Sequence, residues 1–230
     1  MSATTSQRRI AFFDVDSTLV KGNTYKNLIR YDAVTRRRIV ELYVRAYPVW
    51  ILHKLGTVNE FDFRQRFISD TARVIRGWTL PQIDALFAWM ATKLDKAAQP
   101  AAVERLQQHK RDGDYVILVS NMFDSFIQKT AAWFGADVGI GTKLAYSGNI
   151  CAGQIVGASC AGTYKLQYAR EHLNGLSIAF NLADCYGYAD TISDLPLLMA
   201  VGHPVVVSPD KQLLGYAQQH GWEILTAQLD

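Results

Sequence analysis

The sequence predicts an α/β fold, a doubly wound parallel sheet into which an all-helical domain is inserted. Three observations indicate this fold class. Four short apolar runs end on polar residues, as strands do in a parallel sheet that is covered on both faces. Helical patterns alternate with these runs along most of the chain. Residues 22–96 break the alternation, because they hold several helical patterns and no clear strand.

The apolar runs define the predicted strands. They are Ile10–Phe13, Tyr115–Val119, Cys185–Tyr188 and Pro204–Val207. The first run leads directly into Asp14, and the second leads into Ser120. Residues 145–156 contain a Ser-Gly-Asn turn and predict a β-hairpin outside the main sheet.

The predicted helices lie between the strands and within the inserted segment. In the core they are Pro100–Lys110, Asp124–Phe134, Thr163–Leu173, Asp194–Met199 and Asp210–Gln219. Two more helices, Phe61–Ile75 and Pro81–Leu94, are predicted within the inserted segment. The sequence therefore predicts a core of residues 1–21 and 97–230, and a helical insert of residues 22–96.

The composition is that of an ordinary globular protein. Of the 230 residues, 49% are hydrophobic and 20% are charged, which excludes a disordered chain, a collagen-like fibre and a disulfide scaffold. Cys151, Cys160 and Cys185 form no CxxC pair, and their odd number predicts free thiols in the reducing cytoplasm. No apolar stretch precedes the first strand, so no secretory signal is expected.

One apolar stretch, Tyr43–Leu55, bears on membrane contact. It is shorter than the roughly 20 apolar residues that a transmembrane helix needs, so no transmembrane segment is expected. We expect this stretch to form a buried helix of the insert. Peripheral contact with a membrane surface stays open as the alternative.

Charge is distributed unevenly along the chain. Residues 22–98 carry 13 Lys and Arg against 7 Asp and Glu, whereas the rest of the chain carries 11 against 14. A basic insert on an acidic core favours an anionic ligand. The run Arg36–Arg38 lacks interleaved aromatic residues and a recognised binding motif, so no nucleic-acid partner is expected.

Several chemically active side chains follow predicted strands or lie at predicted helix starts. They are Asp14, Asp16, Ser120, Asn121, Lys165, Asp190 and Asp194. Ligands of an open α/β sheet bind beyond the carboxyl ends of its strands, so these side chains are expected to lie together. Converging carboxylates need a compensating cation, and hard oxygen ligands suit Mg²⁺. Zinc is not expected, because no grouping of His and Cys has zinc spacing.

These residue types suit the hydrolysis of a small phosphomonoester. Asp14 can attack phosphorus as a carboxylate and form an aspartyl-phosphate. Asp16 lies two residues further along the chain, where it can protonate the leaving oxygen and later activate water. Ser120 and the backbone N–H groups after it can hold phosphoryl oxygens, and Lys165 can offset their charge.

Four motifs occur in the order known from one family. They are DVDST at residues 14–18, the serine of LVSN at Ser120, the lysine of GTYK at Lys165 and YADTISD at residues 188–194. With these motifs, the chain resembles the haloacid dehalogenase superfamily over nearly its whole length. The helical insert directly after the first motif is similar to the cap of the phosphoserine-phosphatase-like subfamily.

The resemblance implies a role for each matching residue. Asp14 would be the nucleophile and a metal ligand, and Asp16 would be the acid/base with its backbone carbonyl on the metal. Asp190 would bind Mg²⁺ directly, and Asp194 would support it. The residues expected to bind the phosphoryl group are Thr18, Ser120, Asn121, Lys165 and Ser193.

The chain departs from serine-specific members of this subfamily at one position. They carry a glutamate suited to a substrate ammonium a few residues after the first motif, where this chain has Asn23. Phosphoserine is therefore doubtful, and the expected leaving group is neutral or anionic with an apolar part. The candidate contacts are Arg64, Arg66 and Arg73 on one predicted helix. Arg64 and Arg66 are two residues apart, so at most one of them is expected to point into the site with Arg73.

Two alternative functions stay open. The apolar stretch Tyr47–Leu52 and its basic flanks make a lipid-phosphate phosphatase of the phosphatidylglycerophosphate type the second candidate. A signalling receiver module also phosphorylates an aspartate on a parallel sheet, but it is far shorter and has no insert. The sequence does not indicate an oligomeric state.

Overall fold

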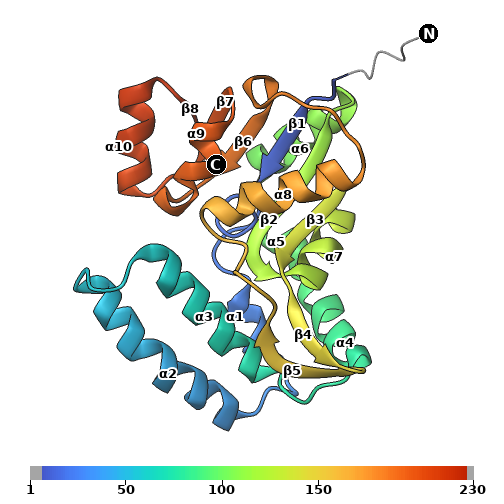
Figure 1. Ribbon diagram of the computed structural model, residues 1–230, viewed down its shortest axis with the longest axis vertical. Helices are drawn as coiled ribbons and strands as arrows, with labels where there is room; N and C mark the ends of the chain where they lie inside the picture. The colour runs from blue at the N-terminus through green and yellow to red at the C-terminus, as the bar shows by residue number, and fades with distance from the viewer. Residues whose placement is uncertain (1–6, 227–230) are drawn as a thin grey trace.

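The computed structural model describes residues 7–226, and its centre is a six-stranded sheet (Figure 1). The strands are β1 (Ile10–Phe13), β2 (Tyr115–Phe123), β3 (Val138–Thr142), β6 (Tyr186–Ala189), β7 (His203–Val207) and β8 (Glu223–Leu225). Their order is β3-β2-β1-β6-β7-β8, and every neighbouring pair is parallel. The first strand of the chain therefore lies inside the sheet, between β2 and β6.

Helices cover both faces of the sheet, as the sequence predicts. One face is covered by α6 (Pro100–Arg111) and α7 (Asp124–Phe134), and the other by α8 (Thr163–Gly175), α9 (Leu195–Ala200) and α10 (Lys211–His220). Neighbouring residues of β1 face opposite layers, because Phe13 packs with residues of α6 and α7 while Phe12 packs with residues of α8. Both faces of the strand are thus buried, which explains its unbroken apolar sequence.

Two outer strands, β3 and β8, are absent from the sequence prediction. β3 reads VGIGT, and its glycines weaken the strand pattern. A Cβ atom on Gly139 would lie 2.2 Å from the carbonyl oxygen of Ile127, so glycine here lets α7 approach the strand closely. β8 has three residues, none of them fully buried, which is too short a pattern to recognise from sequence.

The described secondary structure of the insert is helical. Its helices are α1 (Tyr25–Leu28), α2 (Arg36–Lys54), α3 (Glu60–Val74), α4 (Leu80–Ala91) and α5 (Leu94–Ala97). α3 begins at an Asn59 cap, and α4 begins at a capping box formed by Thr79 and Gln82. The helix predicted over residues 81–94 is divided, because α4 ends at Ala91 and α5 follows. Figure 1 shows α2 on the outer side of α3, and α4 beside α7 of the core.

The predicted hairpin is present and is bound to the insert. β4 (Leu144–Ser147) and β5 (Ile150–Ile155) pair antiparallel. The backbone N–H of Gly77 donates to the carbonyl oxygen of Cys151 at 2.8 Å, and the N–H of Cys151 donates to the carbonyl oxygen of Trp78 at 2.8 Å. The hairpin therefore connects the core to the loop between α3 and α4.

The expectation of a buried helix at residues 43–55 is wrong. This stretch lies in α2 and its C-cap, and the buried residues of α2 are Leu42 and Ala46. α2 packs mainly against α3, so the opposite side of the helix presents apolar side chains to solvent. No helix within residues 7–226 is long and apolar enough to cross a bilayer.

Candidate active site

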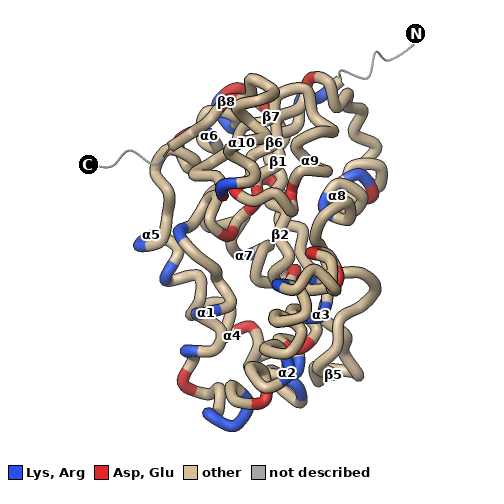
Figure 2. The backbone as a smooth tube through the Cα atoms, turned by 90° about the vertical axis from the view of Figure 1, so that its left-hand side faces the viewer, with Lys and Arg blue, Asp and Glu red and all other residues tan. Residues whose placement is uncertain are grey.

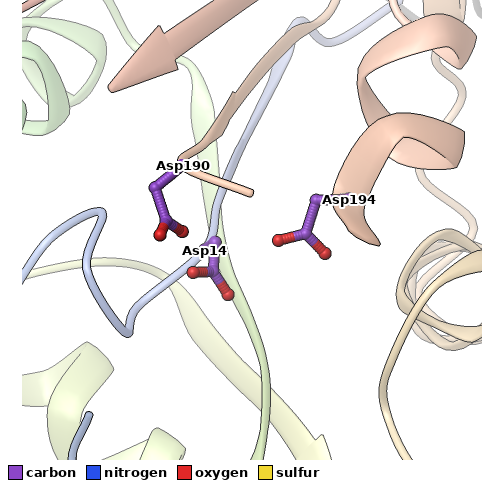
Figure 3. Close-up of side chains that lie close together, drawn as sticks. All are labelled: Asp14, Asp190 and Asp194. Carbon is purple, nitrogen blue, oxygen red and sulfur yellow. The ribbon is translucent and has the colours of Figure 1, made fainter. Parts of the chain in front are cut away.

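The central strands bring the predicted side chains to one edge of the sheet. Asp14 directly follows β1, Ser120 and Asn121 lie in the second half of β2, and Asp190 directly follows β6. These three strands are neighbours and run parallel, so their carboxyl ends meet. Asp194 joins them from the residue before α9. Figure 3 shows the carboxylates of Asp14, Asp190 and Asp194 gathered around a common space.

Three carboxylates and one lysine form a buried cluster. Oxygen atoms of Asp14, Asp190 and Asp194 lie within 4.8 Å of one another, and all three residues are buried. Lys165, in the first turn of α8, places its Nζ 2.6 Å from Asp14 Oδ1 and 2.7 Å from Asp194 Oδ1. A single lysine among three carboxylates leaves an excess of negative charge here. Figure 2 shows acidic segments gathered in the middle of the molecule, where the sheet faces the insert.

Burial and mutual repulsion change the ionisation of the cluster. Burial raises the pKa of Asp14 to about 6, although the Lys165 ammonium opposes this shift. Burial and the charges of Asp14 and Asp194 raise the pKa of Asp190 to about 8. Burial opposes the charge on Lys165, but its two carboxylate partners raise the pKa of the lysine above its usual range. The carboxylates therefore lack sufficient positive charge from the described side chains.

The turn after β1 holds Asp16 and Thr18. The Thr18 hydroxyl lies 3.1 Å from Asp190 Oδ1 and 3.3 Å from Asp14 Oδ2, so it bridges two of the clustered carboxylates. The Asp16 carboxylate lies outside the cluster, and accepts a hydrogen bond from the backbone N–H of Thr24 at 2.6 Å. Burial raises the pKa of Asp16, against the effect of this hydrogen bond. Asp16 lines the same cavity as Asp14.

The other predicted phosphate contacts fall into two groups. Ser120 and Asn121 line the cavity together with Asp14 and Lys165. The Ser193 hydroxyl instead lies 2.6 Å from the hydroxyl of Thr191, and it is Thr191 that lines the cavity. Thr191 was not predicted, although its position directly after Asp190 was a usable signal.

A cavity of about 560 Å³ extends from the carboxylate cluster to the insert. Its wall on the insert side is largely aromatic and includes Tyr25, Tyr43, Tyr47, Trp50, Phe63 and Phe67. Sequence patterns did not indicate this wall, although the spacing of Tyr43, Tyr47 and Trp50 fits one face of a helix. Asn23 lies in the same lining. An aromatic wall beside a polar floor fits a phosphorylated molecule whose other end is apolar or flat.

Of the three candidate arginines, Arg64 is the one that lines the cavity. Its Nε donates to Glu60 Oε1 at 2.5 Å, and no partner for its terminal nitrogens is found within residues 7–226. Arg66 and Arg73 instead face Asp70, with N–O distances of 3.2 and 3.4 Å. The expectation that Arg73 reaches the site is therefore wrong, because the buried carboxylate of Asp70 holds it elsewhere.

A second cavity, of about 600 Å³, lies at the opposite edge of the sheet. Residues at the amino ends of β6, β7 and β8 line it, among them Tyr186, His203 and Trp222. Its Arg105 and Glu223 are paired with each other. Residues of the four motifs instead line the first cavity, at the carboxyl ends of the strands, which is therefore the candidate active site.

The model of the haloacid dehalogenase-like hydrolase family matches residues 11–199. This chain belongs to that family. The matched range includes the whole carboxylate cluster and Lys165, and it confirms the resemblance that the four motifs indicate.

Relatives of this hydrolase carry phosphatase names. It is similar to a probable phosphatase of Mycobacterium tuberculosis, with 29% identity over 227 residues that cover 95% of this chain and 75% of the relative. It is also similar to a histidinol-phosphatase of Neisseria meningitidis, with 25% identity over 228 residues that cover 95% and 98%. The chain is thus an enzyme, a haloacid-dehalogenase-type phosphatase.

Solved structures share its fold. A protein of unknown function from Bordetella pertussis has a TM-score of 0.81 at 23% identity, covering 96% of this chain and 99% of that one. A phosphoserine phosphatase, solved as a phospho-aspartyl intermediate analogue, has a TM-score of 0.63 at 16% identity, covering 98% and 96%. The α/β fold with its helical insert is therefore the fold of this family. These findings favour neither the lipid-phosphate phosphatase nor the receiver module.

Proposed function

We propose that this hydrolase cleaves a small phosphomonoester in the presence of Mg²⁺ and through an aspartyl-phosphate on Asp14. The observation that carries the proposal is the position of Asp14 on the cavity floor. There it accepts a hydrogen bond from Lys165 and lies close to the carboxylates of Asp190 and Asp194. A carboxylate that attacks a phosphoryl group needs cations beside it. Lys165 supplies one, and the acidic cluster offers a place for another.

The donor set fits Mg²⁺. Carboxylate oxygens are the hard ligands that this ion prefers, and a small number of them leaves positions for water and phosphate. In this proposal Asp14, Asp190 and the backbone carbonyl of Asp16 hold the ion, and Asp194 supports them. The bound ion would stabilise the negative charge of the phosphoryl group during transfer.

The side chains of the chain would carry out the bond changes. An Asp14 carboxylate oxygen attacks phosphorus, and the bond from phosphorus to the leaving oxygen breaks. Asp16, whose raised pKa favours its protonated form, gives a proton to that oxygen. Asp16 then takes a proton from the water that attacks the aspartyl-phosphate, which releases inorganic phosphate and restores Asp14. Ser120 and Lys165 hold the phosphoryl oxygens throughout.

The insert of residues 22–96 would act as a cap over a core of residues 1–21 and 97–230. Support comes from the cavity lining, which combines Asp14 and Lys165 of the core with Trp50 and Arg64 of the insert. Such a cap excludes water and contacts the part of the substrate beyond the phosphate.

The cytoplasm is the proposed compartment. Cys151, Cys160 and Cys185 are buried and form no disulfide, which fits a reducing environment.

Between pH 8 and pH 6, Mg²⁺ should bind about tenfold more weakly for each unit by which the pH falls. Without the metal, the pKa of Asp190 is raised to about 8 and that of Asp14 to about 6, so the ion must displace a proton from Asp190. The folded state keeps this proton at a pH where the unfolded state has lost it, so the metal-free protein should be less stable at pH 8 than at pH 6. Calorimetric Mg²⁺ titrations and thermal unfolding at both pH values measure these effects.

Removal of the metal provides the matching test of activity. Dialysis against EDTA should abolish phosphatase activity, and added Mg²⁺ should restore that activity. Full activity after exhaustive dialysis, or a Mg²⁺ affinity that does not change between pH 6 and 8, would contradict the proposed metal site.

The lining of the cavity also favours a class of substrate. Asn23 and Arg64 line the cavity on the side of the insert, where we expect the leaving group, and that side of the lining contains no carboxylate. A substrate ammonium would therefore lack a charged partner there, whereas an anionic group could bind the terminal nitrogens of Arg64. The aromatic wall adds a preference for an apolar or flat group. We propose a neutral or anionic leaving group with such a part.

Arg64→Ala should raise KM for an anionic substrate by about tenfold or more, because a charged hydrogen bond contributes about 1.5–3 kcal/mol. Arg66→Ala is the matched control, since Arg66 lies on the same helix but faces Asp70. The panel should include aryl phosphates, glycerol phosphates, sugar phosphates, histidinol phosphate and phosphoserine. Phosphoserine as the best substrate by about tenfold in kcat/KM would overturn the inference from Asn23.

A further inference from the structure

The outer side of α2 carries a continuous row of exposed apolar residues. Val40, Val44, Tyr47, Ile51 and Leu55 follow one another at intervals of three or four residues, so they share one face of the helix. The row extends for about 22 Å at 1.5 Å per residue. Val44 is 67% exposed and Leu55 is 71% exposed. In Figure 1, this helix lies at the outer edge of the insert.

Exposed apolar residues are concentrated on this helix. Of the 15 large hydrophobic residues that are exposed within the described part of the chain, eight lie in α2 and its C-cap. They are Val40, Tyr43, Val44, Tyr47, Trp50, Ile51, Leu52 and Leu55. The others are scattered over six or more elements and loops. A contiguous patch of this kind marks an interaction surface, whereas scattered residues do not.

Basic residues accompany the apolar row. Arg36 and Arg37 lie at the start of α2, Arg45 near its middle and Lys54 at its end, all of them exposed. α2 has a single acidic residue, Glu41, whose Oε1 lies 2.9 Å from Nε of Arg37. The surface therefore combines an apolar centre with unbalanced positive charge, which fits a partner that is anionic and apolar.

We propose that α2 docks the enzyme on an anionic lipid surface, and lies in the plane of the interface. An exposed apolar helix face that carries Trp and Tyr and has basic residues beside it can bind in this way. Tyr47 and Trp50 have polar atoms at the ends of apolar rings, which suits the headgroup region. A second copy of this chain is a poorer partner, because its α2 would bring the same excess of positive charge.

The docked helix would place the mouth of the cavity beside the lipid surface. Tyr43, Tyr47 and Trp50 belong both to the exposed face of α2 and to the cavity wall. The proposal concerns where the enzyme works and does not depend on a lipid substrate, so it can fail while the proposed function stands.

Co-sedimentation with vesicles tests this proposal. We expect the full chain to bind vesicles of phosphatidylcholine and phosphatidylglycerol about tenfold more tightly than vesicles of phosphatidylcholine alone, and to be released by high salt. Changing both Val44→Glu and Leu55→Glu should weaken binding about tenfold or more, because it places charge at the centre of the apolar row. Neither residue lines the cavity, so hydrolysis of a soluble aryl phosphate should be unchanged and should report correct folding.

Leu176→Glu is the matched control, because Leu176 is a similarly exposed residue at the end of α8. It should leave vesicle binding unchanged. The proposal is overturned if the wild type does not bind anionic vesicles at low salt, or if the double variant binds as tightly as the wild type. It is also overturned if sedimentation velocity shows a dimer that the double variant dissociates, because a second copy then covers the surface.

Discussion

The Asp14→Asn variant is expected to have a kcat about 10³-fold lower than the wild type, or lower still. Asparagine keeps the shape of the side chain and removes the charge that attacks phosphorus. The change does not disturb the apolar strand before it, and the backbone N–H of residue 14 still donates to the carbonyl oxygen of Tyr188. Steady-state kinetics with the best substrate of the panel measures the loss.

Two controls accompany this variant. Asp84→Asn changes an exposed carboxylate that pairs with Lys129 away from the cavity, and it should retain wild-type turnover. Thermal unfolding should show that Asp14→Asn is folded. Near-wild-type turnover by the pure, folded Asp14→Asn enzyme would contradict nucleophilic catalysis by this residue.

The second large effect is expected for Lys165→Met, on both activity and stability. The variant keeps an extended side chain but leaves the carboxylates of Asp14 and Asp194 without their buried cation. Removing one partner of a buried ion pair costs about 3–5 kcal/mol, so the free energy of unfolding in EDTA should fall by about this amount. Turnover should fall about 100-fold or more, since a positive charge on the phosphoryl group is lost.

Urea unfolding with and without Mg²⁺ separates the two roles of Lys165. The ion supplies positive charge to the same carboxylates, so Mg²⁺ should restore part of the stability while turnover stays low. Lys211→Met, at an exposed position of α10, is the control. A Lys165→Met protein as stable as the wild type in EDTA would show that the lysine does not compensate the cluster.

Strong local signals made much of the core predictable. The bounds predicted for residues 124–134 agree with α7, because Asp124 opens the helix and Gly135 ends it in a left-handed conformation with φ of 74°. The strand before Asp14 was predictable because burial on both faces requires an unbroken apolar run. Features that depend on distant packing were not predictable. The glycines of β3 are explained by the close approach of α7, and the exposure of α2 is explained by its packing mainly against α3.

The same distinction holds for the site. Strand ends and motif order predicted that the carboxylates and Lys165 lie together, although Asp14 and Lys165 are separated by 151 positions in the chain. The sequence could in part have shown which arginine faces the cavity. Arg66 and Arg73 lie four and three residues from Asp70, which is the spacing of helical ion pairs. The aromatic wall combines residues of α2 and α3 with Tyr25, so only their packing reveals it.

Trapping the covalent intermediate tests the central claim most directly. The enzyme is mixed with a substrate labelled in its phosphoryl group, quenched in acid within one turnover, digested and analysed by mass spectrometry. The proposed mechanism predicts a phosphoryl group on Asp14 that hydroxylamine removes, as expected of an acyl phosphate, and no label in the Asp14→Asn protein. Turnover without any labelled peptide, or a label on another residue such as Ser120, would contradict it.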